Sequence, residues 1–401
     1  MQRRLLFVAP WFLFPASTGG RIRTSQILRG MKGKAFSITL ASPVTHDGER
    51  RYAADLAAVC DRFVSWPSRR KSPWRKYSRL RHLPGRLPVA VATDRSSKGR
   101  LAVARELAAR PDLLVVDFPH AAVLLPDAIG VPSVIFTHNV EAEIFRRQIA
   151  AAGNPLARCV WRDQTAKMER YERETLARFD RVIAVSERDA KQFREGYAIR
   201  DVHPVPTGVD LDYFAYHAPA AEPRVVFTGS MDWLPNIEGI EWLLREVWPS
   251  VAKAVPGASL KVIGRDPPAR LVRAADGTSI RFTGFVDDVR PHVQGAAACV
   301  IPLLVGGGTR IKAYEAMAQG CPIVSTAIGM EGLPAEPLRH FLLADRPDEF
   351  AAALIRLLTD RALGGRLSTA ARAFVEASFS NTRVAAEFER ICLGAIDGVG
   401  K

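Results

Sequence analysis

One stretch constrains the fold more than any other, and residues 297–327 read AACVIPLLVGGGTRIKAYEAMAQGCPIVSTA. Residues 299–305 form a short apolar run that ends at three glycines, which is typical of a buried strand. A helix is predicted over 310–319, with Gly320 as its C-cap. A second buried strand is predicted over 323–325. The order strand, glycine loop, helix, strand predicts a parallel βαβ unit.

The glycine loop and the start of this helix form a candidate anion site. Gly306, Gly307 and Gly308 let a ligand approach bare backbone, and the first N–H groups of the helix, which Thr309 can cap, have no internal partners. Gly307, Gly308 and Thr309 are the predicted donor ligands in this loop. A phosphate placed there accepts these N–H groups and interacts favourably with the helix dipole. Arg310 and Lys312 add two positive charges where the dipole disfavours cations, which indicates a bound anion.

Glu315 extends this candidate site along the helix. It lies three residues after Lys312, so both side chains share one helix face. A carboxylate there can accept hydrogen bonds from two neighbouring hydroxyls, as on a ribose. Together the residues predict a sugar–diphosphate site, and the alternative is a glycine-rich turn with a Lys312–Glu315 surface pair. The spacing matches neither a P-loop nor a G-x-G-x-x-G fingerprint.

The segment GGGTRIKAYEAMAQGCPIVST resembles the donor-binding segment of retaining glycosyltransferases of family 4, in a subgroup with a GGGTRLK-like loop. The family usually has two glutamates eight positions apart. Glu315 matches the second, whereas Gly307 stands at the position of the first, which leaves the sugar undefined. The resemblance covers nearly the whole chain. It implies an α/β GT-B fold, in which two Rossmann-like doubly wound domains face each other across a cleft and the C-terminal helix crosses back.

The resemblance also implies the domain boundaries. An N-terminal acceptor-binding domain is expected over 1–214, together with a returning helix over 379–401, and a nucleotide-sugar-binding domain over 223–378. The segment VPTGVDLDYF, residues 205–214, resembles the family element that closes the first domain. The Ala/Pro-rich tract HAPAAEPR, residues 217–224, is the predicted linker.

Charge and cysteine usage narrow the classes of partner and location. The chain has 401 residues and a net charge of +14, which favours nucleotides, nucleic acid or an anionic membrane surface. Five scattered cysteines without a C-x-x-C pair favour a reducing cytoplasm. The apolar run near the N-terminus resembles a signal peptide, but Pro10 and Pro15 interrupt it. We expect a cytoplasmic protein, with peripheral attachment to the inner face of the membrane as a further option.

The most unusual composition lies in residues 62–100, which hold twelve Lys or Arg and a single acid, Asp94. Aromatic residues are interleaved with the cations: Trp66, Trp74 and Tyr77. This combination suits the surface of an anionic bilayer or a lipid-linked acceptor. It also suits single-stranded nucleic acid, and a solvated basic segment is the third alternative. Many relatives use the first domain to meet a membrane-borne acceptor, which favours the first interpretation.

Glycines and arginines follow the first predicted strand. In the family, a glycine pair at this place approaches the donor diphosphate, and Gly20 is the matching position. Arg21 and Arg23 stand at the start of the next helix and can hold an acceptor phosphate. The alternative for both arginines is a solvated helix end.

The motif THNVEAE follows a predicted buried strand over 133–137. Ligands collect at the carboxyl ends of strands in open α/β sheets. His138 there can donate a hydrogen bond to a developing charge or a sugar hydroxyl, and it matches the active-site histidine of the family. A structural histidine is the alternative. Asn139 and Glu141 are candidates for acceptor contact.

The second domain begins with a strand over 225–228 followed by Gly229 and Ser230, where backbone N–H groups can meet a phosphate or sugar. Many relatives place an Arg and a Lys in this loop to bind the diphosphate, and this chain has neither there. Arg310 and Lys312 are therefore predicted to take over that role.

Predicted roles can also be given to three further residues of the second domain. In relatives the nucleotide base lies against a GFV segment, which implies that Phe285 and Val286 lie beside the base. Asn236 is predicted to cap a helix over 237–244 or to contact the ligand.

The resemblance implies retaining transfer of a sugar from a nucleotide-sugar donor to a saccharide or lipid-linked acceptor, in cell-surface polysaccharide or glycolipid synthesis. No metal and no cofactor are expected, because no ligand set with metal spacing is found in the sequence. Two alternatives remain. One is a GT-B enzyme without an acceptor, such as a nucleotide-sugar epimerase, and the other is a basic nucleic-acid-binding protein.

Overall fold

The computed structural model describes residues 2–45, 47–68, 79–275, 277–305 and 310–398. The chain forms two compact units. The first unit comprises Met1–Thr207 and Thr382–Lys401, and the second comprises Gly208–Asn381.

The boundary differs from the predicted one, which placed residues up to 214 in the first domain. Val209 and Phe214 pack into the core of the second unit, and Val209 also forms a bridge with Ser380. This stretch therefore belongs to the second unit. The chain returns to the first unit at Thr382, close to the predicted position 379.

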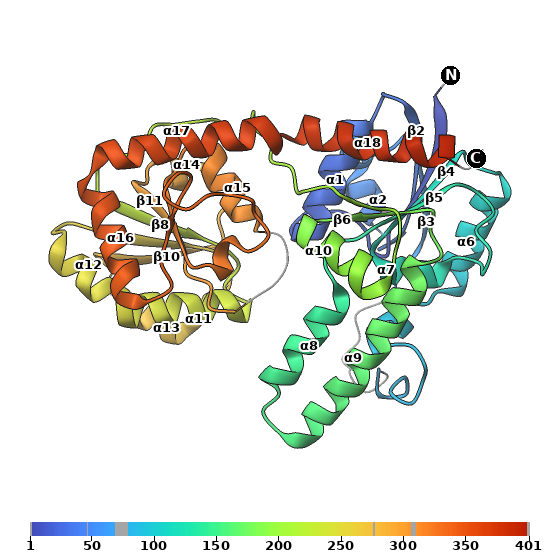
Figure 1. The fold of residues 1–401 in the computed structure, drawn as a ribbon, viewed down its shortest axis with the longest axis horizontal. Coiled ribbons are helices and arrows are strands. Elements are labelled where there is room, and N and C mark those ends of the chain that lie inside the picture. The colour runs from blue at the N-terminus through green and yellow to red at the C-terminus, as the bar shows by residue number, and fades with distance from the viewer. Residues whose placement is uncertain (1, 46, 69–78, 276, 306–309, 399–401) are drawn as a thin grey trace. The chain divides into compact units, whose positions relative to one another are not determined.

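In the described part of the first unit, parallel strands form one sheet in the order β3-β2-β1-β4-β5-β6-β7 (Figure 1). The order reverses between β1 and β4. The strands are β1 Arg3–Val8, β2 Phe36–Val44, β3 Arg62–Pro67, β4 Leu113–Asp117, β5 Ser133–Phe136, β6 Arg181–Ala184 and β7 Val202–Pro204. The helices are α1 Gly19–Met31, α2 Gly48–Arg51, α3 Ala53–Val59, α5 Val89–Asp94, α6 Ser97–Ala108, α7 Phe118–Ala121, η1 Ala122–Leu124, α8 Glu141–Ala151, α9 Pro155–Leu176, α10 Glu187–Lys191, η2 Gln192–Gly196 and α18 Asn381–Gly398.

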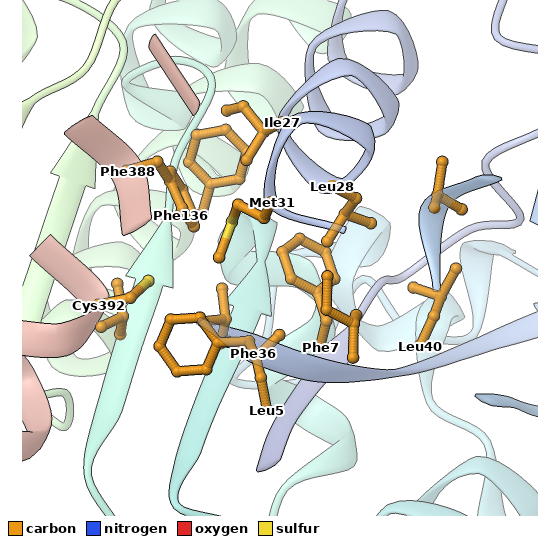
Figure 2. Close-up of a cluster of buried hydrophobic side chains, with 14 of the residues drawn as sticks. Leu5, Phe7, Ile27, Leu28, Met31, Phe36, Leu40, Phe136, Phe388 and Cys392 are labelled. Carbon is orange, nitrogen blue, oxygen red and sulfur yellow. The ribbon is translucent and has the colours of Figure 1, made fainter. Parts of the chain in front are cut away.

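Both faces of this sheet are covered, as expected for a doubly wound fold. Successive residues of a strand point to opposite faces, so Leu5 and Phe7 lie in one core while Leu6 and Val8 lie in the other. The first core is closed by α1, which contributes Ile27, Leu28 and Met31, and by α18, which contributes Phe388 and Cys392 (Figure 2). The C-terminal helix is thus an integral part of the first unit.

The described part of the second unit also forms a parallel sheet, in the order β10-β9-β8-β11-β12-β13, which reverses between β8 and β11. Its strands are β8 Arg224–Thr228, β9 Ser259–Ile263, β10 Ile280–Gly284, β11 Ala298–Ile301, β12 Ile323–Ser325 and β13 Leu342–Leu343. Its helices are α11 Leu234–Trp242, η3 Leu243–Val247, α12 Trp248–Ala254, α13 Ala269–Ala274, α14 Arg290–Gln294, α15 Ile311–Ala318, η4 Ile328–Met330, α16 Pro347–Thr359 and α17 Arg361–Ser378.

The predicted βαβ unit is confirmed. Strands β11 and β12 pair in parallel, with Cys299 opposite Ile323, and α15 connects them. The first strand is shorter than predicted, however, because it ends at Ile301 and not at Val305. Pro302 follows at once and has no N–H to donate to a ladder. Val305 is consequently exposed.

The first unit carries a helical hairpin. Helices α8 and α9 lie side by side and extend away from the sheet (Figure 1). Among the residues that the structure describes, no helix is both long and apolar enough to cross a bilayer.

Candidate active site

A polar cluster in the first unit lies where its strand order reverses. Asp117 ends β4, His138 follows β5, and Thr24 lies on α1, which follows β1. The Thr24 hydroxyl donates to Asp117 Oδ2 at 3.0 Å, and His138 Nε2 lies 2.7 Å from Asp117 Oδ1. Ligands bind at this kind of switch point in open α/β sheets. The structure therefore places His138 where a ligand-contacting residue is expected.

The environment of His138 determines its protonation. Burial lowers the pKa of the imidazole below its ordinary value, and this effect outweighs the opposing charge of Asp117. The ring is then neutral near pH 7, and its hydrogen bond to Asp117 assigns the proton to Nε2. Nδ1 is left as an acceptor. His138 is thus poised to accept a hydrogen bond from a hydroxyl, whereas the sequence had predicted donation.

Gly20 lies beside the His138 ring, at a position that leaves little room for a side chain. A Cβ added at Gly20 would lie 2.5 Å from Phe118 Cζ and 3.6 Å from His138 Nδ1. Phe118 itself stacks on His138, with ring centroids 3.9 Å apart. Its φ of 62° is unusual for a bulky residue and indicates strain at the end of β4. The structure thus brings the start of α1 against the histidine, and the contact of Gly20 with a diphosphate stays a prediction.

The two arginines of α1 have different environments. Arg23 is buried, and its guanidinium donates to the backbone oxygens of Thr137, at 2.8 Å, and Val205. It also lies over the Phe136 ring. The predicted acceptor role of Arg23 is therefore wrong, because this side chain ties α1 to the strand ends. Arg21 is half-buried, and burial lowers its pKa, so it stays a candidate for acceptor contact.

The two candidate residues that follow His138, Asn139 and Glu141, also differ in their environments. Asn139 is half-buried and stays a candidate for acceptor contact. Glu141 is buried, and its carboxylate lies 3.7 Å from His120 Nε2. His120 Nδ1 in turn contacts Asp94 at 2.9 Å. Burial opposes charge on His120, but Asp94 and Glu141 outweigh it and raise its pKa to about 10. Glu141 thus takes part in an internal ion pair, and its acceptor contact stays a prediction.

A second cluster lies at the strand reversal of the second unit. Lys312, on the first turn of α15, donates from Nζ to Asn236 Oδ1 at 3.0 Å and lies 4.3 Å from the centre of the Phe227 ring. A Cβ added at Gly229 would lie only 2.7 Å from this Nζ. The ammonium group thus occupies the loop after β8, where relatives were expected to place their own basic residues. This position is compatible with the predicted replacement.

Asn236 organises this loop rather than capping a helix. Helix α11 begins at Leu234, so Asn236 lies inside it. Its Nδ2 donates to the backbone oxygen of Ser230 at 2.8 Å, while its Oδ1 accepts from Lys312. The predicted cap is wrong. The side chain instead holds the β8 loop and the α15 lysine together.

Burial controls the charges of the α15 residues. It lowers the pKa of Lys312 to about 8 and, despite the nearby lysine, raises the pKa of Glu315 to about 7. Both groups lie at the edge of ionisation near neutral pH. A bound anion would favour the charged lysine, and hydroxyl donors would favour the charged glutamate. These shifts match a site that a polar ligand completes.

Arg310 occupies the start of α15 in a different way. It is the N-cap residue and is buried; its Nε donates to the backbone oxygen of Ile328 at 3.0 Å, and its guanidinium lies 3.5 Å from the Glu331 carboxylate. It therefore ties the start of α15 to the segment after β12. The predicted contact of Arg310 with phosphate stays a prediction. The predicted donor ligands Gly307, Gly308 and Thr309 lie outside the described residues.

The sequence reading missed a third cation at the end of β9. Arg265 donates from Nε to Ser230 Oγ at 2.9 Å and pairs with Asp232 at 3.1 Å. It therefore lies at the same loop as Lys312. The available signal was its place just after the segment SLKVIG, which ends in Gly264 and forms β9, because ligands collect at such strand ends.

Gly264 allows the end of β9 to pack closely against the Gly229 loop, and a larger residue there should disrupt this packing. A Cβ at position 264 would collide with the backbone oxygen of Gly229. We expect Gly264→Ala to destabilise the protein by roughly 1–3 kcal/mol or more, since backbone atoms cannot move aside as side chains do. Urea unfolding measures this loss. Gly365→Ala, in α17 with open space around it, should be neutral or slightly stabilising. Equal stability of both variants would contradict the packing described.

The two residues predicted to contact the nucleotide base, Phe285 and Val286, differ in exposure. Phe285 is 72% exposed, and Val286 is half-buried against the core of the second unit. An open aromatic ring can stack on a base. The role of both residues stays a prediction.

Comparison with known proteins identifies the class of protein. Residues 19–213 match the family described as Glycosyltransferase Family 4, and residues 222–360 match Glycosyl transferases group 1. The chain also resembles sucrose-phosphate synthase from Thermosynechococcus elongatus, with a TM-score of 0.70 at 18% identity over 97% of this chain and 98% of that one. The chain is a GT-B protein of the glycosyltransferase family 4 type.

Two further relatives place this GT-B protein among similar chains. A structure of HepE from Anabaena in complex with UDP and glucose gives a TM-score of 0.66, at 13% identity over 97% of this chain and 99% of that one. A 44.6 kDa protein in the cps region of Klebsiella pneumoniae is 23% identical over 214 residues, which cover 51% of this chain. That match spans 54% of the relative's own length.

Proposed function

We propose that this GT-B protein transfers a sugar, with retention of configuration, from a nucleotide-sugar donor to a saccharide or lipid-linked acceptor. The observation that carries the proposal is the Lys312 ammonium held beside Gly229 at the strand reversal of the second unit. A cation at the end of a parallel strand and at the start of a helix is suited to a diphosphate. The matches to glycosyltransferase families support the reaction class.

In this proposal each part of the second unit contacts one part of the donor. Lys312 and Arg265 neutralise the diphosphate from two sides of the Gly229 loop. Glu315, one turn further along α15, accepts the ribose hydroxyls. Phe285 lies against the base. HepE binds UDP, which makes uracil the first base to test.

The first unit would supply the acceptor side and the sugar contact. His138, oriented by Asp117, accepts a hydrogen bond from a sugar hydroxyl. Arg21, Asn139 and Glu141 are the remaining candidates for acceptor contact. As the family resemblance implies, the acceptor oxygen attacks the anomeric carbon from the face that the diphosphate leaves. The leaving diphosphate takes the acceptor proton. Because side-chain cations carry the countercharge, we propose that no metal and no cofactor takes part.

The kind of product is proposed from one relative. The Klebsiella protein is described by its place in the cps region. We propose that this GT-B protein acts in the synthesis of a cell-surface polysaccharide or glycolipid.

Thermal unfolding with nucleoside diphosphates tests the donor site. UDP, GDP, ADP and dTDP are each added in large excess to the purified protein. A nucleotide at about a hundred times its Kd should stabilise the protein by roughly 2.7 kcal/mol, a clear rise in Tm. We expect one base to dominate. If none of the four raises Tm, the donor assignment fails.

The pKa of Lys312 predicts how donor affinity depends on pH. Its folded pKa of about 8 lies below the ordinary value, so the free protein loses the ammonium charge as pH rises through 8. Affinity for the stabilising nucleotide should therefore fall up to tenfold per pH unit above pH 8. Calorimetric titration from pH 6.5 to 9.5 measures this. Lys312→Gln should remove the dependence, and an unchanged profile in that variant would assign the titration elsewhere.

A further inference from the structure

We propose that the tip of the α8–α9 hairpin, residues 144–162, docks this protein onto an anionic lipid bilayer. The tip is well formed, because Asn154 caps α9 by accepting from the Ala157 N–H at 2.8 Å. Within the tip, Phe145 of α8 and Trp161 of α9 pack edge to face, with ring centroids 5.8 Å apart, and hold the two helices together. The tip therefore presents a fixed surface at the end of a projecting element (Figure 1).

The apolar side chains of the tip share one helix face. Leu156 is 76% exposed, Cys159 is exposed and Val160 is half-buried. Residues three and four apart lie on the same face of a helix, so these three form a short apolar stripe at the start of α9. Trp161 is half-buried at its edge. A stripe of this kind with a neighbouring tryptophan suits the boundary between headgroups and acyl chains.

Charge complementarity identifies the partner. Residues 144–162 contain four arginines and no acidic residue. In the described part of the chain, Arg158 and Arg162 take part in no ion pair. Arginines beside an exposed apolar stripe can bind lipid phosphates while their stems follow the apolar surface. Aliphatic Leu156 and Val160 offer no stacking face to a base, so these features favour a bilayer over nucleic acid.

A second basic element is fastened to the same hairpin. Segment 79–88 holds three arginines and no acid. It is bonded to α9, because Lys167 donates to the Leu83 oxygen at 2.6 Å and Arg170 to the Arg86 oxygen at 2.7 Å. Leu80 in this segment is exposed. The hairpin thus carries cations on its tip and on the segment along its side, and both add to attraction by an anionic surface.

The native cysteines make the docking measurable. Cys159 lies at the tip and is exposed, whereas the other four cysteines are buried. A thiol-reactive, polarity-sensitive fluorophore on the full-length protein should therefore report from the tip. We expect a blue shift and co-sedimentation with vesicles of phosphatidylcholine containing 30% phosphatidylserine, and neither with pure phosphatidylcholine. A Cys159→Ser, Arg273→Cys protein, labelled on the second unit, should sediment without the shift.

Charge reversal and loss of the apolar tip are tested separately. Arg158→Glu with Arg162→Glu, and Leu156→Asp alone, should each lower the vesicle partition coefficient at least tenfold. The matched controls are Arg273→Glu and Leu338→Asp, exposed residues of the second unit, which should bind like the wild type. All variants should keep the thermal shift with nucleotide, which separates docking from the proposed function.

Three results would overturn docking by the tip. The first is no binding to anionic vesicles. The second is binding without a blue shift at Cys159, which would place the contact elsewhere. The third is tight binding to a single-stranded oligonucleotide that the double arginine variant abolishes and Leu156→Asp does not, since that pattern assigns the tip to nucleic acid.

Discussion

Replacing His138 by alanine is expected to lower kcat for sugar transfer by about 10²–10³-fold, with a smaller change in donor affinity. The imidazole is fixed by its hydrogen bond to Asp117 and by stacking on Phe118, and its Nδ1 faces Gly20. Losing one preorganised group that contacts the reacting sugar typically costs this much. Initial rates of nucleoside diphosphate release with the stabilising donor measure the effect.

His340 provides a matched control for this change. It is equally buried, and it stacks on Phe374 with centroids 4.6 Å apart, but it lies outside both clusters. His340→Ala should therefore lose similar stability while keeping kcat. Asp117→Asn should retain the fold and shift the lower limb of the pH–rate profile, because the partner that fixes the tautomer is changed. A kcat that falls equally in His138→Ala and His340→Ala would mean that His138 is only structural.

Replacing Lys312 by alanine is expected to weaken binding of the nucleoside diphosphate by about 10–100-fold. A hydrogen bond to a charged group contributes roughly 1.5–3 kcal/mol, and this ammonium lies where a Cβ on Gly229 would meet it. The loss should affect the nucleotide and its sugar conjugate alike, because both carry the diphosphate. Calorimetric titration at pH 7 measures it.

Lys261 serves as the control for charge. It is a half-buried lysine on β9 in the same unit, so Lys261→Ala removes an equal charge away from the Gly229 loop. Its Kd should stay within about twofold of the wild type. If both alanine variants bind equally well, Lys312 does not contact the diphosphate.

Strand and helix patterns predicted part of the architecture of this protein, and the family resemblance predicted the rest. The run before the glycines and residues 323–325 indicated the β11–α15–β12 unit, whereas the two doubly wound sheets were expected from the resemblance. Local patterns do not show which residues meet across a sheet. Asp117 ends β4, and its hydrogen bond to His138 depends on β4 and β5 being neighbours.

The same limit explains the errors at the site. Arg23 and Arg21 look alike in sequence, yet a helix turns by about 100° per residue, so one points into the core and the other toward the surface. Glu172 lies in α9 among opposite charges at helical spacing, a pattern that is typical of a solvated helix face. It is fully buried, where it accepts from the Glu141 N–H at 2.7 Å and the Tyr197 hydroxyl at 2.8 Å. Burial raises its pKa to about 8, which no pattern of charges along α9 indicates.

The most direct test of the central claim is ¹H NMR of the reaction with an α-linked nucleotide sugar, chosen by the base that raises Tm. The proposal predicts release of the nucleoside diphosphate and an α-configured product, which is an α-glycoside when an acceptor is present and an α-hemiacetal, seen before mutarotation, when water replaces it. Both signals should grow about 10²–10³-fold more slowly in His138→Ala and, below donor saturation, about 10–100-fold more slowly in Lys312→Ala. A β-configured product, or a nucleotide sugar that is epimerised while its diphosphate stays attached, would contradict it.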